Sequence, residues 1–153
     1  MTPFLVALHV TIMFAATALA QGPAFLLWRA MRRGDVAAMR GIVDMYQGIG
    51  ILVGPLYGIG VIVGLVAVFV GGFDPFAPWL IIAYVLTLVA FATPSLVTVP
   101  RMIRVGAAAH DSPLDAPSQE LRDAISHATT PVFWVDAVLV VLFIVDMVVK
   151  PFS

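Results

Sequence analysis

The chain contains no cysteine among its 153 residues. Disulfide bonds, thiolate metal sites, iron–sulfur clusters and cysteine nucleophiles are therefore excluded, and the redox compartment cannot be inferred from cysteine usage. Charged side chains are also scarce, because they make up 11% of the sequence against about 25% in soluble domains, whereas 61% of the residues are hydrophobic. This balance excludes a water-soluble fold and predicts a single integral membrane domain over residues 1–153.

The few basic side chains are unevenly distributed. The net charge of -1 gives no indication of a partner, but seven of the eight basic residues fall in two connections. Arginine-rich connections stay in the cytoplasm, because moving guanidinium groups across a bilayer is unfavourable. The pattern therefore indicates membrane topology rather than nucleic-acid binding. The first connection carries Arg29, Arg32, Arg33 and Arg40, the second carries Arg101, Arg104 and Arg122, and the remaining basic residue is Lys150.

Four apolar segments are long enough to cross the ~30 Å hydrocarbon layer as helices. We expect them at residues 4–28, 41–70, 79–99 and 131–149. Because the first segment ends at arginines, it runs inward and the others alternate in direction. The predicted fold class is all-α, an integral membrane four-helix bundle with both termini on the outer, periplasmic side. The predicted location is the bacterial cytoplasmic (inner) membrane, as a multi-pass protein.

The first apolar segment also resembles a signal peptide, because the small residues Ala18 and Ala20 flank Leu19 just before Gln21. No basic residue precedes the segment, however, and the apolar run continues to Trp28. We therefore expect an uncleaved helix.

The connections are short except for one. Gly34 and Asp35 predict the break between the first two helices. The cytoplasmic connection at residues 101–130 contains a short amphipathic pattern at about 118–127, typical of a helix on a membrane surface or on the bundle end. A segment of this size without a nucleotide-binding glycine pattern does not predict an independent catalytic domain.

Glycines recur at intervals of four in the second segment. They are Gly50, Gly54 and Gly58, followed by Gly60 and Gly64 with the same spacing. Small residues at this interval make a flat stripe that another helix backbone can approach closely. The stripe predicts helix packing, within the bundle or with another subunit, and a flat ligand is the alternative.

Polar side chains inside lipid are costly, so those that remain are candidate functional residues. His9 and Asp146 are expected near the outer face, and Asp44, Gln47 and Asp136 near the inner face. The two inner carboxylates could share a proton or hold a cation. Because both lie near the interface, salt bridges with Arg29, Arg40 or Arg101 are the preferred interpretation.

His9 has the most specific candidate role, because imidazole nitrogen is the usual axial ligand of haem iron between membrane helices. The other histidines, His110 and His127, map to the cytoplasmic side, so a haem b would have a single histidine ligand. The alternatives are a structural hydrogen bond, to Asp146, a threonine or water, and proton or metal handling.

Several short motifs carry a resemblance. The opening Leu8-His9-Val10, the Arg-Arg-Gly-Asp turn at residues 32–35, the glycine-rich second helix and Pro100-Arg101 resemble an uncharacterised family of predicted bacterial integral membrane proteins, classed as a domain of unknown function. This resemblance implies the architecture and no activity. An early Leu-His pair is also similar to copper-resistance membrane domains and bacterial protoporphyrinogen oxidases, a likeness that implies a haem contact at His9.

Two function hypotheses follow. In the first, the chain is a non-catalytic membrane subunit or scaffold that packs against other membrane subunits or a second copy of itself in the lipid bilayer. In the second, it is a small b-type haem or porphyrin-handling redox protein centred on His9. A transporter is a third possibility. Because four spans in one copy seldom enclose a pathway, it would need an oligomer, and no inverted repeat is apparent between the halves of the chain. Whether the protein is an enzyme stays open at this point, and no nucleic-acid partner is expected.

Overall fold

The computed structural model describes residues 1–128 and 132–149, apart from the side chains of residues 132–134, 136, 137 and 147. All regular structure in these ranges is helical, as predicted. The elements are α1 (Thr2–Arg33), α2 (Val36–Gly71), α3 (Pro78–Thr93), the π-helical turn η1 (Pro94–Thr98), α4 (Val99–His110), α5 (Gln119–Ala128) and α6 (Val132–Val149).

Three helical stretches are long and apolar enough to cross a membrane, which suggests a membrane protein. They are α1, α2 and the continuous run of α3, η1 and α4 from Pro78 to His110. They correspond to three of the four predicted segments. The fourth corresponds to α6, although residue 131, where it was expected to start, lies outside the described residues.

The turn between α1 and α2 lies where the sequence predicts it. Gly34 ends α1 with a φ of 65°, a left-handed conformation that glycine adopts without strain. Asp35 caps α2, because its Oδ1 accepts a hydrogen bond of 2.9 Å from the Ala38 N–H. The connection expected between residues 28 and 41 is wrong in its length, since α1 continues to Arg33 and α2 begins at Val36, before Arg40. Arginine, alanine and methionine are good helix formers, and only Gly34 stops the helix.

The third predicted segment also extends past its expected end, from residue 99 to His110. Pro94 and Pro100 both lack a backbone N–H, so the helix between them adopts a π turn rather than stopping. Beyond it, α4 buries an apolar face that includes Met102 and Val105. Part of the predicted connection at 101–130 is therefore helix that packs against α2.

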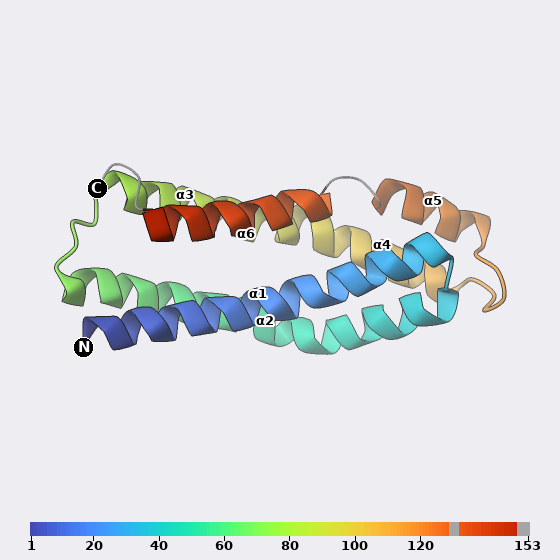
Figure 1. Ribbon diagram of the computed structural model, residues 1–153. Helices are drawn as coiled ribbons and strands as arrows, with labels where there is room; N and C mark the ends of the chain where they lie inside the picture. Colours follow the sequence, from blue (N-terminus) through green and yellow to red (C-terminus); the bar gives the residue numbers. More distant parts are fainter. Residues whose placement is uncertain (129–131, 150–153) are drawn as a thin grey trace.

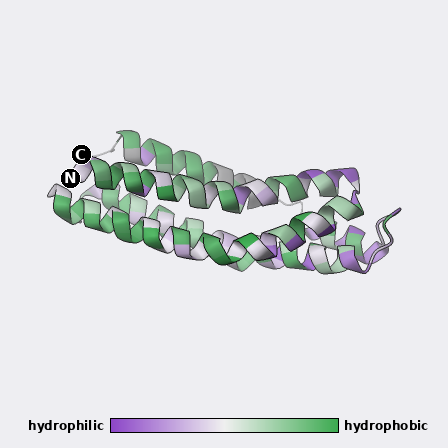
Figure 2. Ribbon diagram, turned by 90° about the horizontal axis from the view of Figure 1, so that it is seen from below, coloured by the Kyte–Doolittle hydropathy of each residue, from purple (hydrophilic) through white to green (hydrophobic). Residues whose placement is uncertain are grey.

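The helices form two antiparallel pairs, α1 with α2 and α3 with α6, and α4 and α5 continue the second pair at one end (Figure 1). The start of α1 and the end of α6 lie at the opposite end (Figure 1). Figure 2 shows hydrophilic residues gathered toward the end that holds α5 and the α1–α2 turn, whereas the rest is mostly hydrophobic.

The main packed core lies at the hydrophilic end. It is built from α1, α2, α4 and α5 and consists of Leu27, Ala30, Val36, Met39, Val43, Met102, Val105, Ala108, Ala109 and Leu121. A smaller cluster of Val68, Trp79 and Leu80 joins α2 to α3 at the other end. We refer to the first cluster as the basic-end core, because the α1 arginines lie beside it in sequence.

Between these two clusters the helices expose large apolar side chains. Ile51 of α2 is 76% exposed and Leu96 of η1 is 75% exposed. Exposing a continuous apolar surface of this kind to water is unfavourable, whereas lipid hydrocarbon chains can cover it. The exposed residues therefore agree with a membrane location.

Candidate functional site

His9 of α1 packs directly on the backbone of α2. Its Nδ1 lies 2.7 Å from the carbonyl oxygen of Gly60, and because a carbonyl can only accept, Nδ1 carries the proton and donates. A Cβ added at Gly64 would lie 2.8 Å from the His9 Cε1 and Nδ1. Glycine at this position thus allows the imidazole to contact the helix backbone. The structural hydrogen bond was expected to go to Asp146, a threonine or water, and the structure shows the Gly60 carbonyl as the partner instead.

The glycines of α2 occupy two faces. A Cβ at Gly60 would lie 2.6 Å from the Met13 sulfur, so Gly60 and Gly64 both contact α1. A Cβ at Gly50, Gly54 or Gly58 would have nothing within 4 Å. At about 100° per residue, the direction midway between Gly60 and Gly64 lies about 100° around the helix from Gly54, the middle residue of the other three, so the two groups face different directions. We call the second face the open glycine face.

A polar contact that the sequence analysis did not single out lies midway along the helices. The Thr17 and Tyr57 hydroxyls are 3.0 Å apart and join α1 to α2. The Tyr57 ring meets Phe91 of α3 edge-on, with centroids 6.3 Å apart at 79°. The sequence indication of this contact was the presence of a threonine and a tyrosine within otherwise apolar segments. These residues connect three helices.

The two acidic candidates in α6 are Asp146 and Asp136. Asp146 is 3% exposed, and neither of its oxygens has a hydrogen-bond partner in the part of the chain that the structure describes. The Asp136 side chain lies outside the described residues. No group of three His, Cys, Asp or Glu residues that could hold a metal ion occurs among the described residues.

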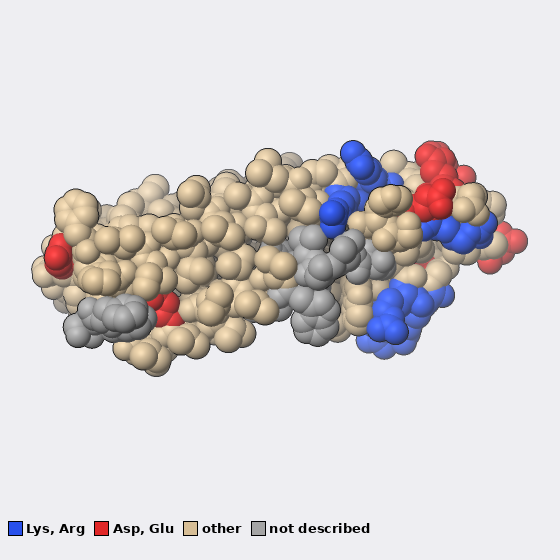
Figure 3. Space-filling model, turned by 90° about the horizontal axis from the view of Figure 1, so that it is seen from above, with Lys and Arg blue, Asp and Glu red and all other residues tan. Residues whose placement is uncertain are grey.

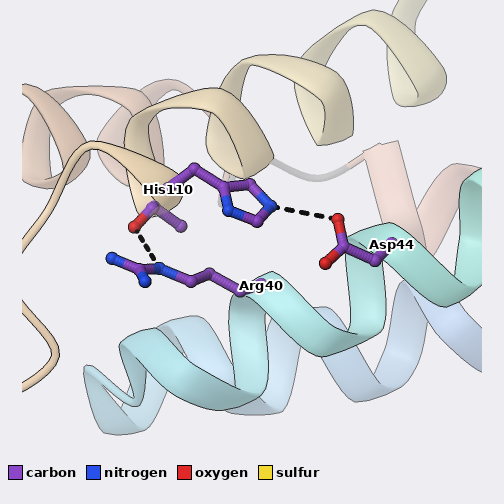
Figure 4. A network of polar contacts seen from close by, with 4 residues as sticks. Arg40, Asp44 and His110 are labelled. Atoms are coloured by element: carbon purple, nitrogen blue, oxygen red, sulfur yellow. Dashed lines mark hydrogen bonds and ion pairs between the residues drawn. The ribbon is translucent and has the colours of Figure 1, made fainter.

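Asp44 and Gln47 are both exposed on α2. The arginine partner predicted for Asp44 is wrong. Its Oδ1 lies 3.0 Å from Nε2 of His110, which follows it by 66 residues and comes from the end of α4 (Figure 4). The side chains are 48% and 57% exposed for His110 and Asp44, and the ion pair forms only when His110 is protonated. Pairs this exposed contribute little stability.

Arg40, one turn earlier on α2, binds the carboxyl end of α4 instead. Its Nε donates to the Ala109 carbonyl at 2.8 Å (Figure 4). Its Nη2 donates to the Ser112 carbonyl. The last carbonyls of a helix have no partner within the helix, and a cation there also offsets the helix dipole. Arg40 therefore ties α2 to α4.

Ser112 extends this network to α5. It is 3% exposed, and its Oγ lies 2.7 Å from the Ala108 carbonyl and 2.8 Å from the Ser118 Oγ. Ser118 in turn accepts from the Leu121 N–H at 3.1 Å and so caps α5. These polar atoms are engaged in holding the basic-end core together.

The network predicts unequal effects for two substitutions. Arg40→Met should lower the free energy of unfolding by about 1–3 kcal/mol, because the Ala109 carbonyl in the last turn of α4 and the Ser112 carbonyl just beyond it lose a charged donor. His110→Ala should lower it by no more than about 1 kcal/mol, since the pair with Asp44 is half exposed. Thermal or denaturant unfolding of the purified variants measures both. A larger loss for His110→Ala than for Arg40→Met would contradict this interpretation.

The fold and these contacts define a class: a helical, strongly apolar protein of the membrane type. No protein-family model, no curated protein and no solved structure matches the chain. Its function is therefore inferred from the residues themselves.

Proposed function

We propose that the protein is a non-catalytic membrane subunit or scaffold whose open glycine face packs against a helix of another subunit or of a second copy. The observation that supports this is the contrast within α2. Gly60 and Gly64 are in contact with Met13 and His9, whereas Gly50, Gly54 and Gly58 have open space where a side chain would be. One face is used within the chain, and the other is available to a partner.

The physical basis is the weakness of the hydrophobic effect between helices in lipid. Lipid tails are as apolar as leucine, so close backbone approach and dispersion contacts drive association instead. A face of three glycines covered only by mobile lipid chains forgoes these contacts. A partner helix would supply them without displacing any side chain of α2.

We further propose four crossings of the bacterial cytoplasmic membrane with both termini outside. At about 1.5 Å per residue, the 18 residues of α6 would extend about 27 Å, close to the ~30 Å hydrocarbon layer. The arginines visible in Figure 3 gather toward one end of the molecule, which supports a cytoplasmic position for that end.

The lengths of α1 and α2 support a protruding basic end. At 32 and 36 residues they extend about 48 and 54 Å, well beyond the ~30 Å layer. In the proposed topology, the excess length places the basic-end core in the cytoplasmic headgroup region and beyond. The glycine face then lies within the lipid.

Photo-cross-linking in native membranes tests the proposed interface. A photo-activatable phenylalanine analogue in place of Ile51, which lies about 60° around the helix from Gly54, should form an adduct of defined mass with a second copy or another membrane protein. Gly54→Leu should reduce the adduct at least fivefold. The matched control is Gly41→Leu, because a Cβ at Gly41 also meets nothing within 4 Å but lies about 20 Å along α2 from Gly54 and about 15 Å from Ile51.

Equal adduct yields in the two leucine variants would contradict the proposed interface. The same conclusion would follow if the parent protein gave no adduct.

The porphyrin alternative has one observation in its favour. Because Nδ1 of His9 donates to Gly60, the ring lone pair is on Nε2, the tautomer that a metal ligand uses when its other nitrogen is held by a carbonyl. A Soret band in the purified protein that disappears in His9→Ala would support it. A colourless preparation after haem-supplemented expression would end it.

A further inference from the structure

The last turns of α1 present a groove of unusual composition. It is shallow and is lined by Phe25, Trp28, Arg29, Arg32 and Arg33. At about 100° per residue, these side chains fall within about 140° of one side of the helix. One face of α1 therefore combines aromatic and guanidinium groups where the apolar run ends.

The two aromatic rings of this groove contact each other, and one arginine contacts a ring. The Phe25 and Trp28 rings are tilted by 32° with centroids 5.8 Å apart. The guanidinium carbon of Arg32 lies 5.2 Å from the Trp28 ring centroid, within the range of a cation–π contact. This contact holds one guanidinium at the edge of the groove.

The three arginines carry charge that no acidic side chain among the described residues neutralises. Arg29, Arg32 and Arg33 are exposed, and within the described ranges none of them makes a hydrogen bond or an ion pair. Arg40, by contrast, uses its guanidinium on two carbonyls of the chain. Three guanidinium groups on one side of the helix, with no ion pair among the described residues, are complementary to an anion with several acceptor oxygens.

The apolar surface beside the groove indicates what carries that anion. Phe25 is 44% exposed and Leu26 is 45% exposed, and the apolar run of α1 continues from them toward its N-terminus. A ligand that places a phosphate at the arginines and a hydrocarbon chain along this apolar surface is complementary to both the charged groove and the surface beside it. We infer that Arg29, Arg32 and Arg33, with Trp28, bind the phosphate of an anionic phospholipid from the adjoining leaflet.

This inference depends on insertion in a membrane but not on the open glycine face, so the two can fail separately. It also assigns the arginines a role beyond setting topology. Guanidinium groups bind phosphate through two parallel hydrogen bonds, whereas lysine offers only a point charge. Exchange of arginine for lysine therefore separates a phosphate site from the general preference of positive charge for the cytoplasm.

The test is lipid retention by the purified full-length protein. The parent protein and Arg29→Lys/Arg32→Lys/Arg33→Lys are reconstituted in nanodiscs of phosphatidylcholine with increasing phosphatidylglycerol, then released and weighed by native mass spectrometry. We expect the parent to retain phosphatidylglycerol at least fivefold more than the triple variant. Arg104→Lys, a change at another exposed arginine, should retain it as the parent does.

Four results would overturn the inference. Equal phosphatidylglycerol retention by the parent and the triple variant would show that Arg29, Arg32 and Arg33 do not form the site. Retention of phosphatidylcholine by the parent equal to that of phosphatidylglycerol would show that the lipid need not carry negative charge. Displacement of the bound lipid by millimolar inorganic phosphate that binds more tightly would assign Arg29, Arg32 and Arg33 to a free phosphate. The same result with an acidic peptide would assign them to an acidic partner.

Discussion

A Gly106→Leu variant is expected to lose about 3 kcal/mol or more of unfolding free energy, because the new side chain would collide with Val43. An ideal Cβ at Gly106 already meets Val43 Cβ at 3.1 Å and Cγ2 at 3.3 Å, and Cγ1 is closer still. Val43 is 2% exposed and branched at Cβ, so it has no free rotamer into which to move. Leucine would force α4 away from α2 and open the basic-end core.

Thermal unfolding and hydrogen exchange of the α4 amides would measure this loss. The matched control is Gly41→Leu on α2, where a Cβ meets nothing within 4 Å and little change is expected. Gly106→Ala should be partly rescued by Val43→Ala, because the second change removes the colliding methyl groups. Unfolding of Gly106→Leu at the parent's temperature would show that α2 and α4 do not pack as described.

The second large effect is expected from Gly64→Leu, which should destabilise the α1–α2 pair by about 2–3 kcal/mol. The His9 ring occupies the space that the leucine would need, and moving the ring breaks its 2.7 Å hydrogen bond to Gly60. Gly48→Leu is the control, since its position is open and lies outside the open glycine face. Because α1 and α2 contact each other within one chain, the effect should be present in the isolated protein.

Unfolding in detergent and the nitrogen-15 spectrum of labelled histidine are the measurements. In the parent, the His9 Nδ1 proton should exchange slowly, and in Gly64→Leu it should be lost to solvent exchange. Equal stability of the Gly64→Leu and Gly48→Leu proteins would contradict the packing of α1 against Gly64.

Much of the fold follows from local sequence signals. The break at Gly34 and Asp35 was predictable because glycine ends helices and aspartate begins them, and both effects act within one turn. The short helix predicted at 118–127 is observed at Gln119–Ala128. The lengths of α1 and α2 were underestimated, because the arginines were interpreted as a turn although they favour helix as much as leucine does.

The candidate site was less accessible to sequence reasoning. The partner of Asp44 is 66 residues away, and no local pattern indicates that the end of α4 would reach α2 at this level. Spacing alone grouped all five glycines into one stripe, whereas the contact with α1 depends on Met13 and His9 of another helix. Depth along an apolar run can be counted, but the direction around the helix axis depends on the packing of its neighbours.

The position of the basic-end core has a practical consequence for work with the purified protein. Its residues pack against one another at one end, whereas the apolar helices beyond it carry mostly exposed side chains. Circular dichroism and solubility would report a well-folded sample as long as this end stays intact, even if a short-chain detergent let the two helix pairs separate. Assays of the glycine face and of His9 should therefore be made in bilayers.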